Sequence, residues 1–147
     1  MSIKVDVYTD GACSGNPGKG GYCAILKYGE NEKIVSGFED DTTNNRMELL
    51  AVIKGLESLK KVCEVNLFSD SSYVVNAFNE GWIYDWQSNG WKTSSKKDVK
   101  NVDLWLNLLE LTKTHQVKFI KVKGHADNPY NNRCDKIAVE EYKKRLK

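Results

Sequence analysis

Four carboxylates stand where they could do chemistry. Asp10 and Asp70 each follow directly on a strand-like segment, whereas Glu48 and Asp135 lie in the first turns of two helix-like segments. Taken alone, either aspartate has an ordinary alternative role, because a carboxylate after a strand commonly caps the next turn or helix. Taken together, all four could converge at one end of a sheet if the two strands are neighbours.

Four carboxylates in a small space need cations, because like charges at that range would otherwise force protonation. Hard ions that prefer oxygen are the natural occupants, and Mg²⁺ suits sparse carboxylate ligation completed by water and phosphate. Two such ions about 4 Å apart serve in-line attack on a phosphodiester, one activating water and the other stabilising the leaving oxygen. The residues alone therefore predict metal-assisted phosphoryl hydrolysis and leave the substrate open.

The periodicity of apolar residues indicates which elements carry these groups. The expected strands span residues 3–9, 20–28, 32–38, 65–69 and 117–122, and the expected helices span residues 43–59, 71–78, 102–111 and 131–146. Residues 81–97, rich in tryptophan and lysine, are predicted to be a loop-like insert.

The order of these elements predicts an α/β fold built on a five-stranded mixed sheet. Short turns join the first three strands, which favours an antiparallel meander. The last two strands alternate with helices, so they should extend the sheet in parallel, with helices on both faces and a right-handed crossover. No repeat or linker divides the chain, and residues 1–147 are expected to form a single domain.

Composition is that of an ordinary globular protein of 147 residues, with 40% hydrophobic and 29% charged residues. No apolar run reaches transmembrane length and the first residues open a strand pattern, so we expect a cytoplasmic monomer without membrane contact. Residues 1–90 hold 8 Lys and Arg against 13 Asp and Glu, a net charge of −5, whereas residues 91–147 hold 14 against 7, a net charge of +7. This asymmetry suggests an acidic site and a surface that faces a polyanion, although basic residues also merely solvate helix faces.

The cysteines argue against thiol chemistry. They form no CxxC pair, which disfavours a disulfide scaffold, a zinc site and a thiol-dependent redox protein. We expect small buried thiols at Cys13, Cys23, Cys63 and Cys134.

Several segments carry patterns more specific than periodicity. They are YTDGACSGNPG (8–18), TTNNRMEL (42–49), SDS (69–71), KGHA (123–126) and NNRCD (131–135), with WKT (91–93) and KNVDLW (100–105) between them. In this order the segments resemble the type 1, bacterial-type ribonuclease H family, and the likeness covers essentially the whole chain. A lone TDG would be weak evidence, but the ordered set is specific.

The resemblance implies a ribonuclease H-like fold and an endonuclease that hydrolyses the RNA strand of an RNA–DNA hybrid, leaving 5′-phosphate and 3′-hydroxyl ends. It implies two Mg²⁺ or Mn²⁺ ions, with Asp10 bridging both ions. Glu48 and Asp70 would favour the nucleophile side and Asp135 the leaving-group side. His125, on a glycine-hinged loop, would assist proton transfer or product release, whereas His115 has no such setting and is expected to be structural.

The resemblance also implies residues that distinguish the two strands of the hybrid. Contacts to RNA 2′-hydroxyls in the minor groove are expected from Gly11, Ala12, Cys13, Asn16 and Asn45. Thr43 and Asn101 would hold a DNA phosphate, and Asn44 a base edge. Helix capping is the alternative for each Asn or Thr, and for Thr43 both roles are compatible.

The insert of residues 82–100 resembles the basic protrusion with which the family grips the hybrid. Substrate contacts are expected from Trp82, Lys92, Lys96 and Lys97, with Lys100 a further phosphate contact. Trp86 has two open interpretations, packing and a sugar contact, whereas Trp105 falls on the buried stripe of its helix. Gln87, Ser88 and Asn89 stand where many relatives have basic residues, and Ser72 stands where a longer amide is common, which puts hybrid affinity in question.

Two other functions are alternatives to hydrolysis of RNA–DNA hybrids. One is another nuclease of the same superfold, such as a junction resolvase or a transposase-like enzyme, against which the Asn44-Asn45 and Gly124-His125 segments argue. The other is a non-catalytic hybrid-binding module, which would be expected to lack a metal ligand, although all four carboxylates are present.

Overall fold

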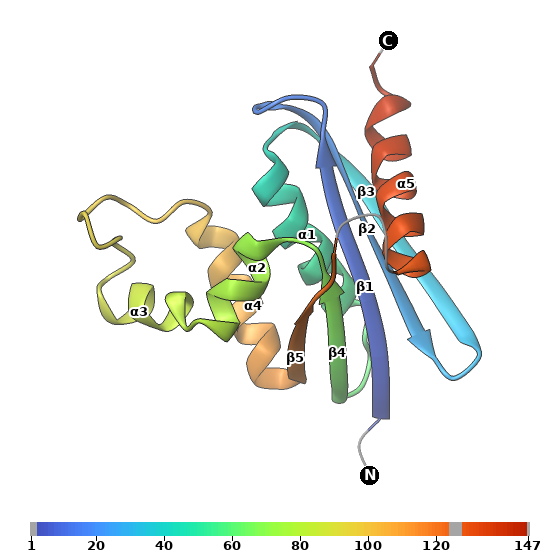
Figure 1. Cartoon of the computed structure of the whole chain (residues 1–147), viewed down its shortest axis with the longest axis horizontal. Coiled ribbons are helices and arrows are strands. Elements are labelled where there is room, and N and C mark those ends of the chain that lie inside the picture. The colour runs from blue at the N-terminus through green and yellow to red at the C-terminus, as the bar shows by residue number, and fades with distance from the viewer. Residues whose placement is uncertain (1–2, 124–127, 147) are drawn as a thin grey trace.

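A five-stranded mixed sheet forms the centre of the protein (Figure 1). The computed structural model describes residues 3–123 and 128–146. The strands are β1 (Ile3–Cys13), β2 (Gly18–Tyr28), β3 (Asn31–Thr42), β4 (Cys63–Ser69) and β5 (Gln116–Lys121), in the spatial order β3-β2-β1-β4-β5. β1, β2 and β3 pair antiparallel, while β4 and β5 extend the sheet in parallel, which confirms the predicted topology.

Helices cover both faces of this sheet, also as predicted. The helices are α1 (Asn44–Glu57), α2 (Ser72–Asn79), α3 (Trp82–Ser88), α4 (Val102–Thr114) and α5 (Pro129–Lys143). α1 packs on β1 and β2 and against α4, whereas α5 packs on the opposite face of β1 and β2 (Figure 1). α2 contacts β5 and carries α3 at the outer end of the molecule.

Alternate residues of the central strands supply the two cores. Val7 and Ala24 are fully buried in the larger core, which they share with the apolar side chains of α1 and α4. Tyr8 and Ile25, one position further along each strand, pack against Ala138 of α5. Because both faces of β1 and β2 are covered, the backbone that carries the acidic residues is held on both sides.

β1 is longer than the sequence pattern predicts. The alternation places its end at Thr9 and puts Asp10 in a turn, but pairing with β2 continues to Cys13, which lies opposite Gly20. Asp10 is therefore inside a strand, and the prediction that it follows one is wrong. Backbone hydrogen bonds to β2 continue the ladder after the side-chain alternation has stopped, so periodicity could not show it.

Residues 82–88 form α3, where the sequence predicts a loop, and this prediction is wrong. Ile83 is fully buried and Trp86 packs on Trp105 with ring centroids 5.4 Å apart, so one face of the helix covers the core. The two residues have helical spacing. A helix of seven residues, however, is too short for this spacing to be recognised as a periodic pattern among polar neighbours. The remainder of the insert contains turns and an isolated bridge between Lys92 and Asp98.

Both helices that carry predicted metal ligands begin with a side-chain cap. The Thr43 hydroxyl accepts from the Arg46 N–H at 3.3 Å at the start of α1, so the capping role of Thr43 is confirmed. Asn128 accepts from the Tyr130 and Asn131 N–H groups, and Pro129 occupies the first turn of α5. α5 begins at Pro129 instead of Asn131 because a proline in the first turn loses no helical hydrogen bond.

The structure also tests the predicted burial of the cysteines and of Trp105. All four cysteines are free thiols, and Cys23, Cys63 and Cys134 are buried as predicted. The prediction of a buried thiol is wrong for Cys13, which is half-buried in the last position of β1. Trp105 is fully buried, which confirms its place in the core. Within residues 3–123 and 128–146, no helix combines the length and the apolar composition that crossing a membrane requires.

Candidate active site

Three carboxylates meet at one end of the parallel pair β1 and β4. Oxygen atoms of Asp10, Glu48 and Asp70 all lie within 4.8 Å of one another. Asp10 and Glu48 are buried, and Asp70 is partly exposed, so solvent reaches the cluster at Asp70. These three residues come from β1, from α1 and from the segment between β4 and α2.

The register of the sheet explains the meeting of the two aspartates. The parallel pairing of β1 with β4 ends where Tyr8 lies opposite Phe68. Asp10 and Asp70 are each two residues beyond this last pair, so they hold equivalent places on neighbouring strands. Equivalent places in a parallel pair bring side chains of the same face together.

Glu48 is held by the backbone of β1. Its Oε1 accepts a hydrogen bond of 2.7 Å from the buried Gly11 N–H. A Cβ atom at Gly11 would lie 2.3 Å from the carbonyl carbon of Met47, so only glycine allows α1 to approach β1 this closely. Gly11 is one of the residues expected from the sequence to contact the hybrid, and its N–H is bonded to Glu48.

Asp135 approaches the same cluster from α5. Its carboxyl shares a hydrogen bond with Asp10, and its charge acts on both Asp10 and Glu48. Two carboxyl groups can share a hydrogen bond only when one of them is protonated. The four predicted acidic residues are therefore grouped in one place, on β1, α1, α5 and the end of β4.

Burial and mutual repulsion make this cluster hard to ionise. Burial, followed by the charges of Glu48 and Asp70, raises the pKa of Asp10 to about 10. Burial and the charge of Asp70 raise the pKa of Glu48 to about 8, against the opposing effect of the Gly11 N–H. Near neutral pH the cluster therefore binds either protons or cations.

The donor atoms decide which cations fit. The grouped donors are carboxylate oxygens, and the partly exposed Asp70 leaves a side from which water and substrate oxygens can approach. Hard divalent ions prefer this ligand set, whereas zinc sites favour thiolate and imidazole. The residues present thus fit the metal-dependent hydrolysis that the sequence predicts.

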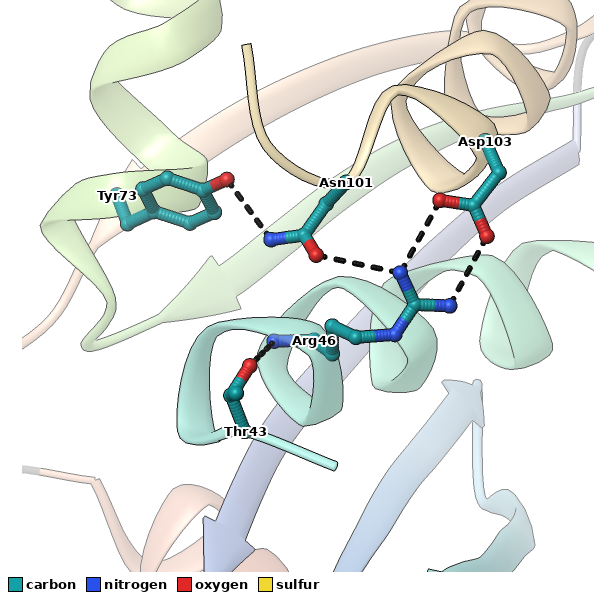
Figure 2. Close-up of polar contacts among 5 residues, drawn as sticks. All are labelled: Thr43, Arg46, Tyr73, Asn101 and Asp103. Carbon is teal, nitrogen blue, oxygen red and sulfur yellow. Dashed lines mark hydrogen bonds and ion pairs between the residues drawn. The ribbon is translucent and has the colours of Figure 1, made fainter. Parts of the chain in front are cut away.

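A second polar cluster joins the start of α1 to the start of α4 (Figure 2). Arg46 donates to both carboxylate oxygens of Asp103, at 3.1 and 2.9 Å, and to Oδ1 of Asn101 at 3.2 Å. Asn101 donates its Nδ2 to the Tyr73 hydroxyl at 3.1 Å, and Trp105 donates to the same hydroxyl at 3.2 Å. Asn101 has a left-handed φ of 63°, and its amide is held at both ends.

A groove of about 680 Å³ runs beside this cluster. Its walls come from the start of α1, from α2 and α3 and from the second half of the insert. The lining residues are Asn16, Thr43, Asn44, Asn45, Tyr73, Trp86, Thr93, Ser95, Lys97, Asp98, Val99, Lys100 and Asn101. Seven of the residues predicted to contact substrate, drawn from three separate stretches of sequence, are therefore gathered on one surface.

The residues predicted to contact the RNA strand lie at the end of β1 and in the turn that follows. The Cys13 thiol donates to the Gly15 carbonyl at 2.6 Å, and Oδ1 of Asn16 accepts from the Asn44 N–H at 2.9 Å. This second bond ties the turn to the first residue of α1. Two further predicted contacts belong to the same region, the half-buried Ala12 and the exposed Asn45.

The insert presents its predicted contact residues to solvent. Lys92 is paired with Asp98, while Lys96, at φ 64°, and Lys97 are exposed. Trp82 is 39% exposed on α3, so its ring is available for contact. Trp86 packs on Trp105, which confirms the packing interpretation. It also lines the groove, and its sugar contact stays a prediction. Ser72 is exposed at the first position of α2.

The two histidines stand apart. His125, with Gly124 and Asp127, lies outside the described residues. His115 is buried, its Nδ1 accepts from the Cys63 N–H at 3.1 Å, and burial lowers its pKa. This hydrogen bond joins the starts of β4 and β5, so His115 is structural, as predicted.

Three residues of this region were given no role by the sequence. Arg46 and Tyr73 hold Asn101 in place, and Asn131 bonds backbone carbonyls near Asp10 and Asp70. Their partners are distant in sequence, and no local spacing indicates such contacts. The one available signal was position, because Arg46 and Asn131 fall inside segments that carry the resemblance.

The sequence matches known proteins over nearly its whole length. The sequence profile described as RNase H matches residues 3–143. The chain is 62% identical over 144 residues to a ribonuclease H of Acetivibrio thermocellus, with 98% of each chain covered. It is 62% identical over 143 residues to a ribonuclease H of Caldanaerobacter subterraneus, covering 97% of this chain and 94% of the relative.

Solved structures share the fold. LC9-RNase H1, described as a type 1 RNase H with the type 2 active-site motif, has a TM-score of 0.86 and 29% identity. The match covers 98% of this chain and 74% of that one. LC11-RNase H1 in complex with an RNA/DNA hybrid has a TM-score of 0.74 at 22% identity, covers 97% of this chain and 99% of that one, and supports the fold alone.

Proposed function

The chain belongs to the ribonuclease H family, and on this premise we propose that it hydrolyses the RNA strand of RNA–DNA hybrids with two divalent ions. The observation that carries the proposal is the acidic cluster, in which oxygens of Asp10, Glu48 and Asp70 lie within 4.8 Å of one another. Membership makes the protein a nuclease and a hydrolase. The cluster supports a metal-dependent reaction that leaves 5′-phosphate and 3′-hydroxyl ends.

Asp10, Glu48, Asp70 and Asp135 would hold Mg²⁺, with Mn²⁺ as a substitute. When bound, such ions supply a nucleophilic water and charge stabilisation for the leaving oxygen. The protein's own part is to keep the carboxylates in place, and Gly11 does so by donating to Glu48. Asp10, in contact with both Glu48 and Asp135, is the proposed bridging ligand.

We further propose that the hybrid lies across the groove beside the polar cluster of Arg46 and Asn101. Thr43 and Asn101, both on its wall, would bind a DNA phosphate, with Asn44 near a base edge. The backbone of residues 11–13, with Asn16 and Asn45, would contact RNA 2′-hydroxyls. LC11-RNase H1, a protein of the same fold, has been solved in complex with a hybrid of this class.

The insert would then bind phosphates farther from the cut. The exposed candidates in the insert are Lys92, Lys96, Lys97 and Trp82. Ser72, exposed at the first position of α2, is a further proposed substrate contact. We propose that the chain acts as a single catalytic domain, residues 1–147, and as a cytoplasmic monomer. Its sequence pattern and composition support this.

The test is cleavage of an end-labelled RNA–DNA hybrid, with duplex DNA and duplex RNA of the same sequence as controls. We expect cuts in the RNA strand of the hybrid only, with Mg²⁺ and not with chelator. Cleavage of branched or duplex DNA would favour the related resolvase or transposase-like function. Hybrid binding without cleavage in Mg²⁺ or Mn²⁺ would favour a binding module.

His125 is proposed to assist proton transfer or product release. His125→Ala should slow turnover about 10²-fold, the range of general acid–base catalysis, with little change in hybrid binding. His115→Ala is the control for loss of an imidazole, and it should lower the unfolding temperature. An unchanged turnover of His125→Ala at saturating hybrid would remove His125 from the mechanism.

A further inference from the structure

One side chain of α5 bridges the two strands that lead to the acidic cluster. Nδ2 of Asn131 donates to the Thr9 carbonyl on β1 at 3.2 Å and to the Phe68 carbonyl on β4 at 3.0 Å. An amide NH₂ group has two hydrogens, so both bonds form at once. In Figure 1 α5 lies along β1 and β2, against which it packs.

The bridge lies where the pairing of β1 with β4 ends, next to the acidic residues. Pairing between β1 and β4 ends at Tyr8 and Phe68, and the acidic residues come directly after that point. Thr9 immediately precedes Asp10, and Phe68 precedes Asp70 by two residues. The bridge therefore joins the two strands where their own ladder stops.

Asn131 also belongs to the helix that carries the fourth carboxylate. Asp135 is four residues later on α5, so the two side chains leave the same face of the helix. The Asn128 side chain accepts from the Asn131 N–H at 3.3 Å and fixes the first turn. A displacement of Asn131 would thus be passed to Asp135 within one helical turn.

Resting on the proposed function, we propose that Asn131 is a positioning residue that fixes Asp10, Asp70 and Asp135 relative to one another. Like charges at this end of the sheet repel, as the effects of Glu48 and Asp70 on Asp10 show. Without the bridge, this repulsion is relieved by moving β1, β4 and α5 apart. A wider cluster binds divalent ions more weakly and places the reacting groups less well.

The test uses two asparagines with the same kind of contact. Asn79 on α2 also donates its Nδ2 to a strand carbonyl, that of Phe119 on β5, at 3.0 Å. Asn131→Ala and Asn79→Ala therefore remove the same hydrogen-bonding group, once near the acidic cluster and once away from it. Thermal unfolding, kcat and KM for the hybrid, and calorimetric Mg²⁺ binding to the metal-free protein are measured for both.

Asn131→Ala should lower kcat and Mg²⁺ affinity about 10- to 100-fold, the usual effect of losing a group that orients metal ligands. Its KM for the hybrid should stay within about twofold, since bound phosphates lie elsewhere. Asn79→Ala removes one such hydrogen bond where Asn131→Ala removes two, so it should lose less thermal stability, and it should keep kcat and Mg²⁺ affinity. Equal kcat and Mg²⁺ affinity in the two variants would show that Asn131 is only structural, and would overturn the proposal.

Asn131→Ser covers the case in which the alanine variant does not fold. The serine hydroxyl donates one hydrogen bond, so kcat and Mg²⁺ affinity should fall between those of wild type and the loss expected for alanine. Wild-type values in a folded Asn131→Ser would also overturn the proposal. A wild-type protein that does not cut hybrids would contradict the proposed function instead, while Mg²⁺ binding would still test the bridge.

Discussion

The acidic cluster and the insert of residues 82–100 are held in opposite ways. Asp10 and Glu48 are buried on β1 and α1 and face other carboxylates, and Glu48 is fixed by the Gly11 N–H. In the insert, the buried anchors are Ile83 and Val99, and the lysines lie at the surface. Lys92 there has an acidic partner, Asp98, within the same insert.

This difference indicates what each region contributes. Groups that act on reacting atoms must stay within fractions of an ångström, so the chain places them on paired strands despite their repulsion. Lysines that bind phosphates through their charge need less exact placement, and exposed side chains are sufficient for them. Substitutions in the cluster should therefore change kcat, and substitutions around the groove and insert should change KM and salt dependence.

The largest effect is expected from Asp10→Asn. The amide is nearly isosteric, so packing should persist, but the proposed anionic bridge between two cations is lost. Single-turnover cleavage should fall about 10³-fold or more. Hybrid affinity measured without metal should be nearly unchanged, because the phosphate and 2′-hydroxyl contacts are elsewhere.

Asp6→Asn is the matched control, since Asp6 lies on the same strand and accepts from Asn66 Nδ2 at 3.2 Å. Its cleavage rate should match wild type. A folded Asp10→Asn that keeps more than about a tenth of the wild-type rate, a barrier change below about 1.4 kcal/mol, would exclude Asp10 as the bridging ligand.

A smaller effect, on binding, is expected from Arg46→Ala. Arg46 holds Oδ1 of Asn101 and both oxygens of Asp103, so its loss frees the amide proposed to bind a DNA phosphate. KM for the hybrid should rise about tenfold, near the 1.5 kcal/mol of a charge-assisted hydrogen bond. kcat should stay within about threefold, because no carboxylate of the acidic cluster moves.

Arg145→Ala provides the comparison for Arg46. Arg145 is likewise partly buried and paired, with Glu141, but it lies near the end of α5. Steady-state kinetics should show no change in KM for this variant. If Arg46→Ala instead lowered kcat and left KM alone, the division between cluster and groove would be wrong.

The fold was predictable wherever packing follows a repeating pattern. Strands of the sheet and the buried face of α1 carry apolar residues at the expected period, and these elements were found within a few residues. α3 was missed because one buried residue, Ile83, and one partly buried residue, Trp86, do not make a detectable period. The extension of β1 to Cys13 was missed because backbone pairing sustains it.

The site was predictable in its ligands and not in its supports. Asp10 and Asp70 could be placed together because neighbouring parallel strands bring equivalent positions to one end. The contacts of Asn131 and Arg46 depend on carbonyls and side chains from distant segments, which only the folded chain brings near. Residues that support a site through contacts with distant segments produce no periodic pattern and no fixed spacing in the sequence.

A modest gain in affinity is expected when the insert is made more basic. Gln87 and Ser88 are exposed at the end of α3. Changing both to lysine should tighten hybrid binding and steepen its salt dependence by about one to two units, because each new phosphate contact releases about one counterion. kcat should not change.

Thr114→Lys and Gln116→Lys together make the control for added charge. Both positions are exposed, and they lie by the start of β5, away from the end of the sheet where the carboxylates meet. Affinity is measured as a function of salt for both double variants. An equal steepening in the two would mean that net charge, and not contact by the insert, determines binding.

The smallest effect concerns the stability of the metal-free protein. Burial raises the pKa of Asp10 and Glu48 in the folded state, to about 10 and about 8, with neighbouring carboxylates adding to the shift. In the unfolded chain both groups are ionised well below neutral pH. The folded state thus binds more protons, and the stability that these protons confer is lost as the pH rises through the folded-state values.

The unfolding temperature of the metal-free protein should therefore fall by about 5 °C between about pH 6.5 and pH 9. The lower limit avoids His115, whose depressed pKa lowers stability only as the pH falls below that of an unfolded histidine. Saturating Mg²⁺ should flatten this dependence, because cations replace the protons. Asp10→Asn should flatten it without metal, whereas Gln87→Lys with Ser88→Lys should leave it as in wild type. If the unfolding temperature of Asp10→Asn depended on pH as steeply as that of wild type, groups other than Asp10 would cause the pH dependence. The acidic cluster would then contribute no more to it than the insert does.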